Sequence, residues 1–384
     1  MLVDMHAHYP MHVFAEPPHA GIRLRRWRRE FLRAALVDLI SRLANYEGPN
    51  DEPSVTMEEI RAGNVGVVFS VLYQPTDEID AGAAFGAGPG REAPAHLLDQ
   101  LDEVEQHLER RHPDVALVVH SRADLDRAVA EGLTAMVHCV EGGFALGADD
   151  AQVRRTVATL AKRGVAYVTL AHLFWRRVAT NAPALPFLPD AWYHRLFRQP
   201  AGLGLSDLGR TAVDALAEHR VLIDVTHMSE ASFVETLGQL DRRRRTRGAP
   251  VIASHGACRL GRRAPEYNLT RDAIVRIADR DGVIGLIVCT HYLHPRRRGR
   301  PQALPASIEV LCRHIDRIVE WTNGFDHVAI GTDLDGYIKP ALPGLTHMSE
   351  MTDLQRCLHE RYGAVDAGKI CSANALRMLH HRFP

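Results

Sequence analysis

The segments VLIDVTHMS at 221–229 and PVIASHGACR at 250–259 decide how this chain folds. Each opens with a short apolar run rich in β-branched residues, at 221–227 and 250–255, and each run closes on a histidine, His227 or His255. Runs of this length and composition are typical of buried parallel strands. Neighbouring strands of a barrel lie about 5 Å apart, so we expect the two imidazoles to ligate one cation together.

Six further runs of the same kind lie elsewhere in the chain, separated by segments long enough for a helix. They occupy residues 2–6, 65–73, 133–141, 165–172, 282–290 and 327–333. Amphipathic patterns between the runs predict helices over 95–111, 149–164, 210–220, 270–282 and 307–324, the last two ending at a glycine. Eight strands alternating with helices predict a single (β/α)8 barrel of the TIM type over residues 1–384, with loop insertions.

Six of the eight runs end in residues that can bind a metal ion or transfer a proton. These residues are His6 and His8, Glu141, His172, His227, His255 and Asp333. Each of them alone is more often an ordinary buried or surface residue, but barrel enzymes carry their catalytic groups at the carboxyl ends of the strands. Six such ends in barrel order therefore favour one shared site. The runs at 65–73 and 282–290 contribute no group of this kind.

The residue types in this set indicate two divalent metal ions. His6 and His8 are two residues apart in an extended run, so both side chains point to one face and can hold one ion. Glu141 has two carboxylate oxygens that can bridge neighbouring ions. Mixed imidazole and carboxylate ligation favours Zn2+, with Mn2+, Co2+ and Fe2+ also open.

Two such ions predict hydrolysis, because together they can activate a water, polarise a scissile carbonyl and stabilise the developing oxyanion. If the other residues supply five ligands, Asp333 is free to take the proton of the water and pass it to the leaving amine. His172 could donate a hydrogen bond to the tetrahedral intermediate, or it could serve only in packing.

Composition and charge argue against several other classes of protein. Hydrophobic residues make up 46% of the chain and the formal net charge is −1, so the protein has no overall field that would attract nucleic acid or an anionic membrane. The arginine runs at 242–245 and 296–300 are expected to be solvated loops. The six cysteines form no CxxC pair, which favours reduced thiols. The start MLVDMHAHYP is unlike a secretory signal, which favours a cytoplasmic protein.

Two segments are expected to lie near the mouth of the barrel. The stretch IRLRRWRREFLRAALVDLI at 22–40 has the pattern of a basic amphipathic helix, which we expect to pack over the mouth rather than on a membrane surface. The glycine-rich stretch DAGAAFGAGPGREAP at 80–94 predicts a loop that could form part of a lid.

A series of motifs in the same order resembles one known family across nearly the whole chain. The motifs are DMHA at 4–7, VEGG at 140–143, YVTLAH at 167–172, GLSDLGRTAVDALAEHRVLIDVTHMS at 204–229, PVIASHGACR at 250–259, NLTRDAIVRIADRDGVIG at 268–285, HIDRIVEWTNGFDHVAIGTDLDG at 314–336 and KICSANALRML at 369–379. They resemble the membrane (renal) dipeptidase family, the M19 metallopeptidases.

This resemblance implies a binuclear zinc site in a TIM-like barrel that hydrolyses dipeptides, often with a D-residue at the C-terminal position. It implies that His172 contacts the substrate and that Asp333 transfers the proton. The metal ligands that it implies are His6, Glu141, His227 and His255, with Glu141 as the bridge. A homodimer is a further expectation from the family.

Two positions depart from the pattern of the family. The family usually begins DxHxD, whereas this chain has Asp4, His6 and His8, so a neutral imidazole replaces a carboxylate ligand and the metal could be held more weakly. The family usually carries an arginine before an asparagine, and that arginine pairs with the carboxylate of the dipeptide. Here Tyr267 precedes Asn268, and a hydroxyl is a weaker carboxylate partner than a guanidinium.

Tyr267 and Arg263 are therefore the expected substrate contacts, with Arg259 and Arg262 as other replacements for the family's arginine. If none of them binds a carboxylate, the substrate could be a modified dipeptide, a cyclic amide or another small amide. Our leading hypothesis is a zinc-dependent dipeptidase. The second is an amidohydrolase that acts on a non-peptide amide, lactam or lactone, and the third is a noncatalytic metal-binding protein.

Overall fold

The computed structural model describes residues 1–13, 53–79, 85–295, 298–336 and 341–384. The helix expected over 22–40 lies outside the described residues, as do residues 80–84 of the expected lid loop and residues 296–297 of the second arginine run. In the described part of the chain, no helix is both long enough and apolar enough to cross a membrane.

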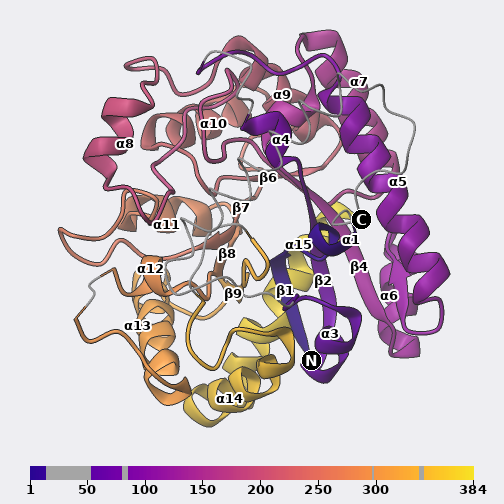
Figure 1. Ribbon diagram of the computed structural model, residues 1–384, viewed down its shortest axis with the longest axis vertical. Helices are drawn as coiled ribbons and strands as arrows, with labels where there is room; N and C mark the ends of the chain where they lie inside the picture. Colours follow the sequence, from indigo (N-terminus) through magenta and orange to yellow (C-terminus); the bar gives the residue numbers. More distant parts are fainter. Residues whose placement is uncertain (14–52, 80–84, 296–297, 337–340) are drawn as a thin grey trace, which may run out of the picture.

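Eight parallel strands form a closed barrel at the centre of the molecule (Figure 1). Around the barrel they are β1 (Leu2–Ala7), β2 (Val65–Tyr73), β4 (Thr134–Glu141), β5 (Tyr167–Thr169), β6 (Leu222–Asp224), β7 (Val251–Gly256), β8 (Val283–Leu286) and β9 (Val328–Ile330). The barrel closes because β2 pairs with β1 on one edge and with β4 on the other, in register from Val67 opposite Ala135 to Tyr73 opposite Glu141. The predicted (β/α)8 fold is therefore confirmed, with a strand in each of the eight predicted runs.

One strand was missed by the sequence analysis. β3 (Ala116–Val118) pairs only with the first residues of β4, with Ala116 opposite Thr134, on the edge that β5 occupies further along. It lies outside the closed circuit of eight strands. It lies in the short apolar run VALVV at 115–119, which was not counted among the eight predicted runs.

Several strands also end earlier than predicted. The ladders stop at Thr169 in β5, Asp224 in β6 and Ile330 in β9, each three residues before the histidine or aspartate that was expected to close the run. After these ends the backbone leaves extended geometry, and His227 and Asp333 take positive φ angles of 65° and 58°. His172, His227 and Asp333 therefore lie on short turns beyond the strand ends, whereas His6, Glu141 and His255 lie within strands.

Helices surround the barrel (Figure 1). The five predicted helices correspond to α5 (Ala93–Arg111), α7 (Asp150–Lys162), α9 (Asp207–Glu218), α11 (Arg271–Ala278) and α13 (Leu304–Thr322). The others are α1 (Pro10–Val13), α3 (Met57–Ala62), α4 (Pro75–Glu78), α6 (Arg122–Glu131), α8 (Asp190–Leu196), α10 (Glu230–Asp241), α12 (Thr290–Leu293), α14 (Met351–Gly368) and α15 (Asn374–Arg382). Helix α13 ends at the predicted place, with Asn323 in the left-handed conformation before Gly324, whereas α11 ends four residues before Gly282.

Alternating strand residues divide the core into two clusters. Val68, Leu72 and Met136 belong to a large cluster that includes residues of most of the helices. Val67 and Phe69, on the other face of the same strands, join residues of the remaining barrel strands and of α15 in a second cluster. Because side chains alternate across a strand, the barrel is filled by packed side chains below the mouth, and the polar groups gather above this layer.

Candidate metal centre

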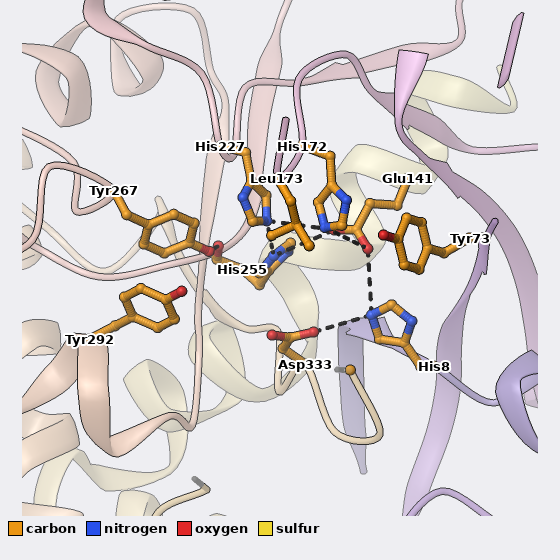
Figure 2. Close-up of a pocket in the computed structure, with 11 residues that line it drawn as sticks. His8, Tyr73, Glu141, His172, Leu173, His227, His255, Tyr267, Tyr292 and Asp333 are labelled. Carbon is orange, nitrogen blue, oxygen red and sulfur yellow. Dashed lines mark hydrogen bonds and ion pairs between the residues drawn. The ribbon is translucent and has the colours of Figure 1, made fainter. Parts of the chain in front are cut away.

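The carboxyl ends of the strands surround one polar pocket. It is lined by His8, Tyr73, Glu141, His172, Leu173, His227, His255, Tyr267, Tyr292, Asp333 and Gly336. Figure 2 shows Glu141 among the imidazoles of His172, His227 and His255, with His8 and Asp333 below it. The predicted site residues therefore converge, with Arg263 as the exception.

Glu141, the last residue of β4, is the centre of the cluster. Its side chain is 2% exposed, and its two oxygens lie 3.4–3.7 Å from the Nε2 atoms of His6, His8, His172, His227 and His255. No described residue donates a hydrogen bond to its Oε1 atom. A buried carboxylate oxygen without a donor is costly, so this arrangement fits a cation between the carboxylate and the imidazoles.

The glycines that follow Glu141 permit this placement. The amides of Gly142 and Gly143 donate to the carbonyls of Thr169 and Leu170 at 2.9 and 3.2 Å. A Cβ atom on Gly143 would lie 2.7 Å from the Leu170 oxygen, so a side chain there would force the loops apart. The two glycines therefore let the backbone after Glu141 come close to the backbone after β5.

Hydrogen bonds below the site fix the proton of His6. The Tyr167 hydroxyl donates its one proton to the carbonyl of Met5 at 3.1 Å and lies 2.8 Å from His6 Nδ1. The hydroxyl oxygen must then accept a proton from Nδ1, which leaves a lone pair on Nε2. Burial and the neighbouring imidazoles also hold the pKa of His6 well below its usual value. A neutral imidazole with a bare Nε2 is the form that binds a metal ion.

The same logic applies to His255 at the end of β7. Ser254 donates its hydroxyl proton to Asp224 at 2.6 Å and lies 2.9 Å from His255 Nδ1. The serine oxygen therefore accepts from Nδ1, and the Nε2 lone pair of His255 faces Glu141. His227 Nε2 lies 3.1 Å from His255 Nε2, so the histidines that end the two motifs lie side by side, and their joint ligation of one ion stays a prediction.

A further group of donor atoms, which includes His6 again, lies beside Glu141. His6 Nε2 and His8 Nε2 are 3.2 Å apart, and Asp333 Oδ1 lies 3.7 Å from the first and 3.1 Å from the second. Three overlapping groups of these side chains could hold a metal ion, namely His6, Glu141 and His255, then His6, His8 and Asp333, and finally Glu141, His172 and His227.

His172 is held by a glutamate that the sequence analysis did not identify. Glu78, at the end of α4, lies 2.6 Å from His172 Nδ1, accepts from the Tyr73 hydroxyl at 2.8 Å and accepts from the Phe174 amide at 2.9 Å. Burial lowers the pKa of His172, but the charges of Glu141 and Glu78 outweigh it and raise the pKa to about 9. The strand at 65–73 therefore does contribute to the site, through Tyr73.

The aromatic side of the pocket carries the departure from the family pattern. The hydroxyl of Tyr267 donates to the His255 carbonyl at 2.6 Å, and its ring centre lies 4.2 Å from that of Tyr292. Arg263 is exposed and does not line the pocket. Arg259 is bound to Glu230 and to backbone carbonyls. Apart from histidine, the described residues that line the pocket include no cationic side chain.

The two aspartates of the GTDLDG motif have different partners. Asp333 faces the imidazoles, whereas Asp335 accepts from the amides of Ser54 and Val55 at 2.9 and 2.6 Å. Asp335 therefore anchors the chain segment before α3, whereas Asp333 lines the pocket together with Glu141.

Comparison with known proteins is consistent with this geometry. A family model described as membrane dipeptidase (peptidase family M19) matches residues 3–382. The dipeptidase ataJ of Aspergillus terreus is 27% identical over 343 residues, which cover 86% of this chain and 77% of that protein. The dipeptidase tcpJ of Claviceps purpurea is 24% identical over 329 residues, covering 85% of this chain and 68% of that protein.

Solved structures share the fold. A metallopeptidase from Rhodobacter sphaeroides, liganded with a phosphinate mimic of L-Ala-D-Ala, has a TM-score of 0.68 at 18% identity, over 100% of this chain and 99% of that chain. The probable dipeptidase PvdM from Pseudomonas aeruginosa has a TM-score of 0.68 at 19% identity, over 92% and 98% of the two chains. Since the family model spans almost the whole sequence, this protein belongs to the membrane dipeptidase family of metallopeptidases, peptidase family M19.

Proposed function

We propose that the protein hydrolyses the amide bond of dipeptides with two zinc ions bound at the mouth of the barrel. The observation that carries the proposal is the buried carboxylate of Glu141, whose Oε1 atom has no donor among the described residues and which stands among five imidazole nitrogens. His6 and His8 would hold one ion, His227 and His255 the other, and Glu141 both. When bound, such ions supply a water of lowered pKa and Lewis acidity at the scissile carbonyl.

The remaining polar residues of the pocket supply proton transfer and orientation. Asp333 accepts the proton of the attacking water and gives it to the leaving amine. His172 donates a hydrogen bond to the oxygen that becomes negative, because its Nδ1 atom is fixed by Glu78 and its Nε2 atom faces the pocket. Leu173 and the paired rings of Tyr267 and Tyr292 form the apolar wall of the pocket.

The substrate class is drawn from the relatives. Two of them are named dipeptidases, and one of similar fold is liganded with a mimic of a dipeptide that ends in a D-residue. A panel of L,L and L,D dipeptides, tested with metal-loaded protein whose zinc content has been measured, examines the proposal directly. Turnover that disappears in His227→Ala, together with loss of bound zinc, is the expected result. Fully folded protein that takes up no transition metal would contradict the proposal.

A second candidate is hydrolysis of a small amide that has no free carboxylate. It is favoured by the hydroxyl of Tyr267, which is already bound to the His255 carbonyl, and by the absence of an arginine or lysine among the described residues that line the pocket. Lactams, lactones and N-acyl amines belong in the same panel. Turnover of these compounds, with acyclic dipeptides inert, would replace the first candidate by the second.

A further inference from the structure

Arg176, in the loop after β5, is a buried cation that has no acidic partner in the described part of the chain. We propose that its guanidinium binds a carboxylate of the substrate, at the end of the pocket away from Tyr267. The inference rests on the proposed function, because this carboxylate belongs to the compound that is cleaved. It assigns a substrate contact to a residue that lies outside the sequence motifs of the family.

The contacts of Arg176 leave most of its hydrogen-bonding capacity unused. The residue is 8% exposed, and its one hydrogen bond to a described residue runs from Nη2 to the Asp77 carbonyl at 3.2 Å. Its Nε atom is buried and has no acceptor among the described residues. Arginine keeps its charge inside proteins and has five N–H donors, so burial of an unpaired guanidinium is costly. An anion beside Arg176 would remove this cost.

A second buried arginine shows how such a side chain is otherwise accommodated. Arg382 is 7% exposed, and its Nε and Nη2 atoms donate to the carbonyls of Val165 and Ala161, each at 2.8 Å. Arg382 thus has an acceptor for both nitrogens, whereas Arg176 has one hydrogen bond at the long end of the usual range. Arg176 is therefore the buried arginine with donors left for a ligand.

The acids of α4, the helix that Arg176 contacts, already have other partners. The carboxylate of Asp77 lies 2.9 Å from His96 Nδ1. The carboxylate of Glu78 lies 2.6 Å from His172 Nδ1 and accepts two further hydrogen bonds. Neither acid forms an ion pair with Arg176, so within the described residues its positive charge stays available to a ligand.

Helix α4 also places Arg176 next to the pocket. Glu78, which follows the residue that Arg176 contacts, accepts from the Tyr73 hydroxyl at 2.8 Å, and Tyr73 lines the pocket. Figure 2 shows Tyr73 and Tyr267 at opposite ends of this pocket. The family usually has an arginine at the position of Tyr267. In this chain the cation nearest to such a role therefore approaches from the other end.

A carboxylate is the group that suits this cation, because a guanidinium can donate two parallel hydrogen bonds to it. The carboxylate could be an acidic side chain of either residue of a dipeptide or its terminal group. Three matched pairs separate these sources: L-Glu-L-Ala against L-Gln-L-Ala, L-Ala-L-Glu against L-Ala-L-Gln, and L-Ala-L-Ala against its C-terminal amide. The second residue is tested in both L and D forms. Because each amide has nearly the shape of its carboxylate, a difference within a pair measures the effect of the charge.

The experiment measures kcat and KM of the zinc-loaded full chain for each pair. We expect wild type to favour the carboxylate in one pair by about 10- to 100-fold in KM, the range that hydrogen bonds to charged groups supply. Arg176→Met should reduce this preference to less than about threefold, since no donor remains, and Arg176→Lys should keep part of it. Arg177→Met is the matched control, because Arg177 is exposed and donates to the Gly86 carbonyl at 2.8 Å, and it should keep the wild-type preference.

Urea unfolding of the same variants supplies a second readout. Replacing an unpaired buried charge by an apolar side chain of similar length should leave the urea midpoint of Arg176→Met unchanged or raise it. A purely structural arginine would instead lower the midpoint and leave the substrate preference unchanged, which overturns the inference. If Arg176→Met does not fold, Arg176→Gln takes its place in the kinetic comparison.

The inference is also overturned if wild type shows no preference for the carboxylate in any pair. Both outcomes leave the proposed function standing, because the peptides are still hydrolysed. If wild type hydrolyses none of the peptides, the proposed function fails, and calorimetric binding of the same pairs to wild type and Arg176→Met then tests the inference by itself.

Discussion

Replacing Glu78 with glutamine should separate the orientation of His172 from the binding of metal. The carboxylate accepts three hydrogen bonds, with His172 Nδ1 and the Tyr73 hydroxyl on one oxygen and the Phe174 amide on the other. An amide has only one accepting oxygen, so in either orientation its NH2 group faces at least one of these donors. Losing one buried hydrogen bond to a charged acceptor costs about 1.5–3 kcal/mol.

We therefore expect Glu78→Gln to lower the free energy of unfolding by about 2 kcal/mol and kcat by about 10- to 100-fold, with KM little changed. Complete loss of an oxyanion donor costs about 100- to 1000-fold in kcat, and a misdirected imidazole should lose part of that. The measurements are urea unfolding, steady-state hydrolysis and zinc content of the same preparation. Zinc content should stay at the wild-type value, because Glu78 contacts none of the proposed ligands.

Glu235→Gln is the matched control for this experiment. Glu235 also accepts from two backbone amides, those of Gly204 and Leu205, but it lies on α10 away from the pocket. It should lose stability and keep wild-type kcat. If Glu78→Gln also keeps wild-type kcat while its stability falls, then Glu78 supports the fold and does not direct His172 in the reaction.

Three further outcomes follow from the described contacts. His314 is buried, and burial lowers its pKa to about 4, so as pH falls from about 6.5 the unfolded chain binds a proton that the folded chain does not. The wild-type protein should therefore lose stability between pH 6.5 and 4.5, and His314→Gln should remove about 2 kcal/mol of this loss. If the free energy of unfolding of His314→Gln falls with acid as steeply as that of wild type, the prediction is refuted. Gly285→Ala places a Cβ atom 2.0 Å from the Ser254 carbonyl oxygen and should lower the free energy of unfolding in urea by at least about 1–3 kcal/mol. If this variant is as stable as wild type, then β7 and β8 can separate at this point without cost. Tyr267→Phe removes a hydrogen bond to the His255 carbonyl and should lower the free energy of unfolding by about 1 kcal/mol. The KM for dipeptides should change less than about threefold, and a tenfold rise in KM would show that the hydroxyl binds the substrate carboxylate.

The sequence was sufficient for the barrel because each of its strands is an apolar run whose packing leaves few other choices. Runs such as 65–73 are buried along almost their whole length, and this burial makes them visible as continuous apolar segments. β3 lies in the apolar run VALVV at 115–119, but this strand pairs only with β4 and lies outside the closed barrel, so the alternation of strands and helices did not call for it. The strand ends were placed too late because His227 and Asp333 belong to turns with positive φ, which apolar patterning does not register.

The site was predicted as far as it depends on residues at the ends of runs. Glu78 escaped because it lies five residues after β2, and α4 must fold back before its carboxylate can reach His172. A glutamate in a one-turn helix gives no sequence signal of burial. Tyr267 lines the pocket, and its predicted substrate contact stays a prediction. Its hydrogen bond to the His255 carbonyl depends on the path of the loop after β7 and could be seen only in three dimensions.

The seam between β1 and β9 has a consequence for synthesis on the ribosome. Asp4 and His6 lie near the start of the chain, and they are bonded to Thr332 and Asp333 near its other end. A growing polypeptide exposes its first histidines long before their opposite wall has been translated, so only weak, incomplete coordination is available to it. If the proposed function holds, binding of an ion beside His6 would be among the last events of folding, and a fragment that stops short of position 333 should bind it more weakly than the full chain.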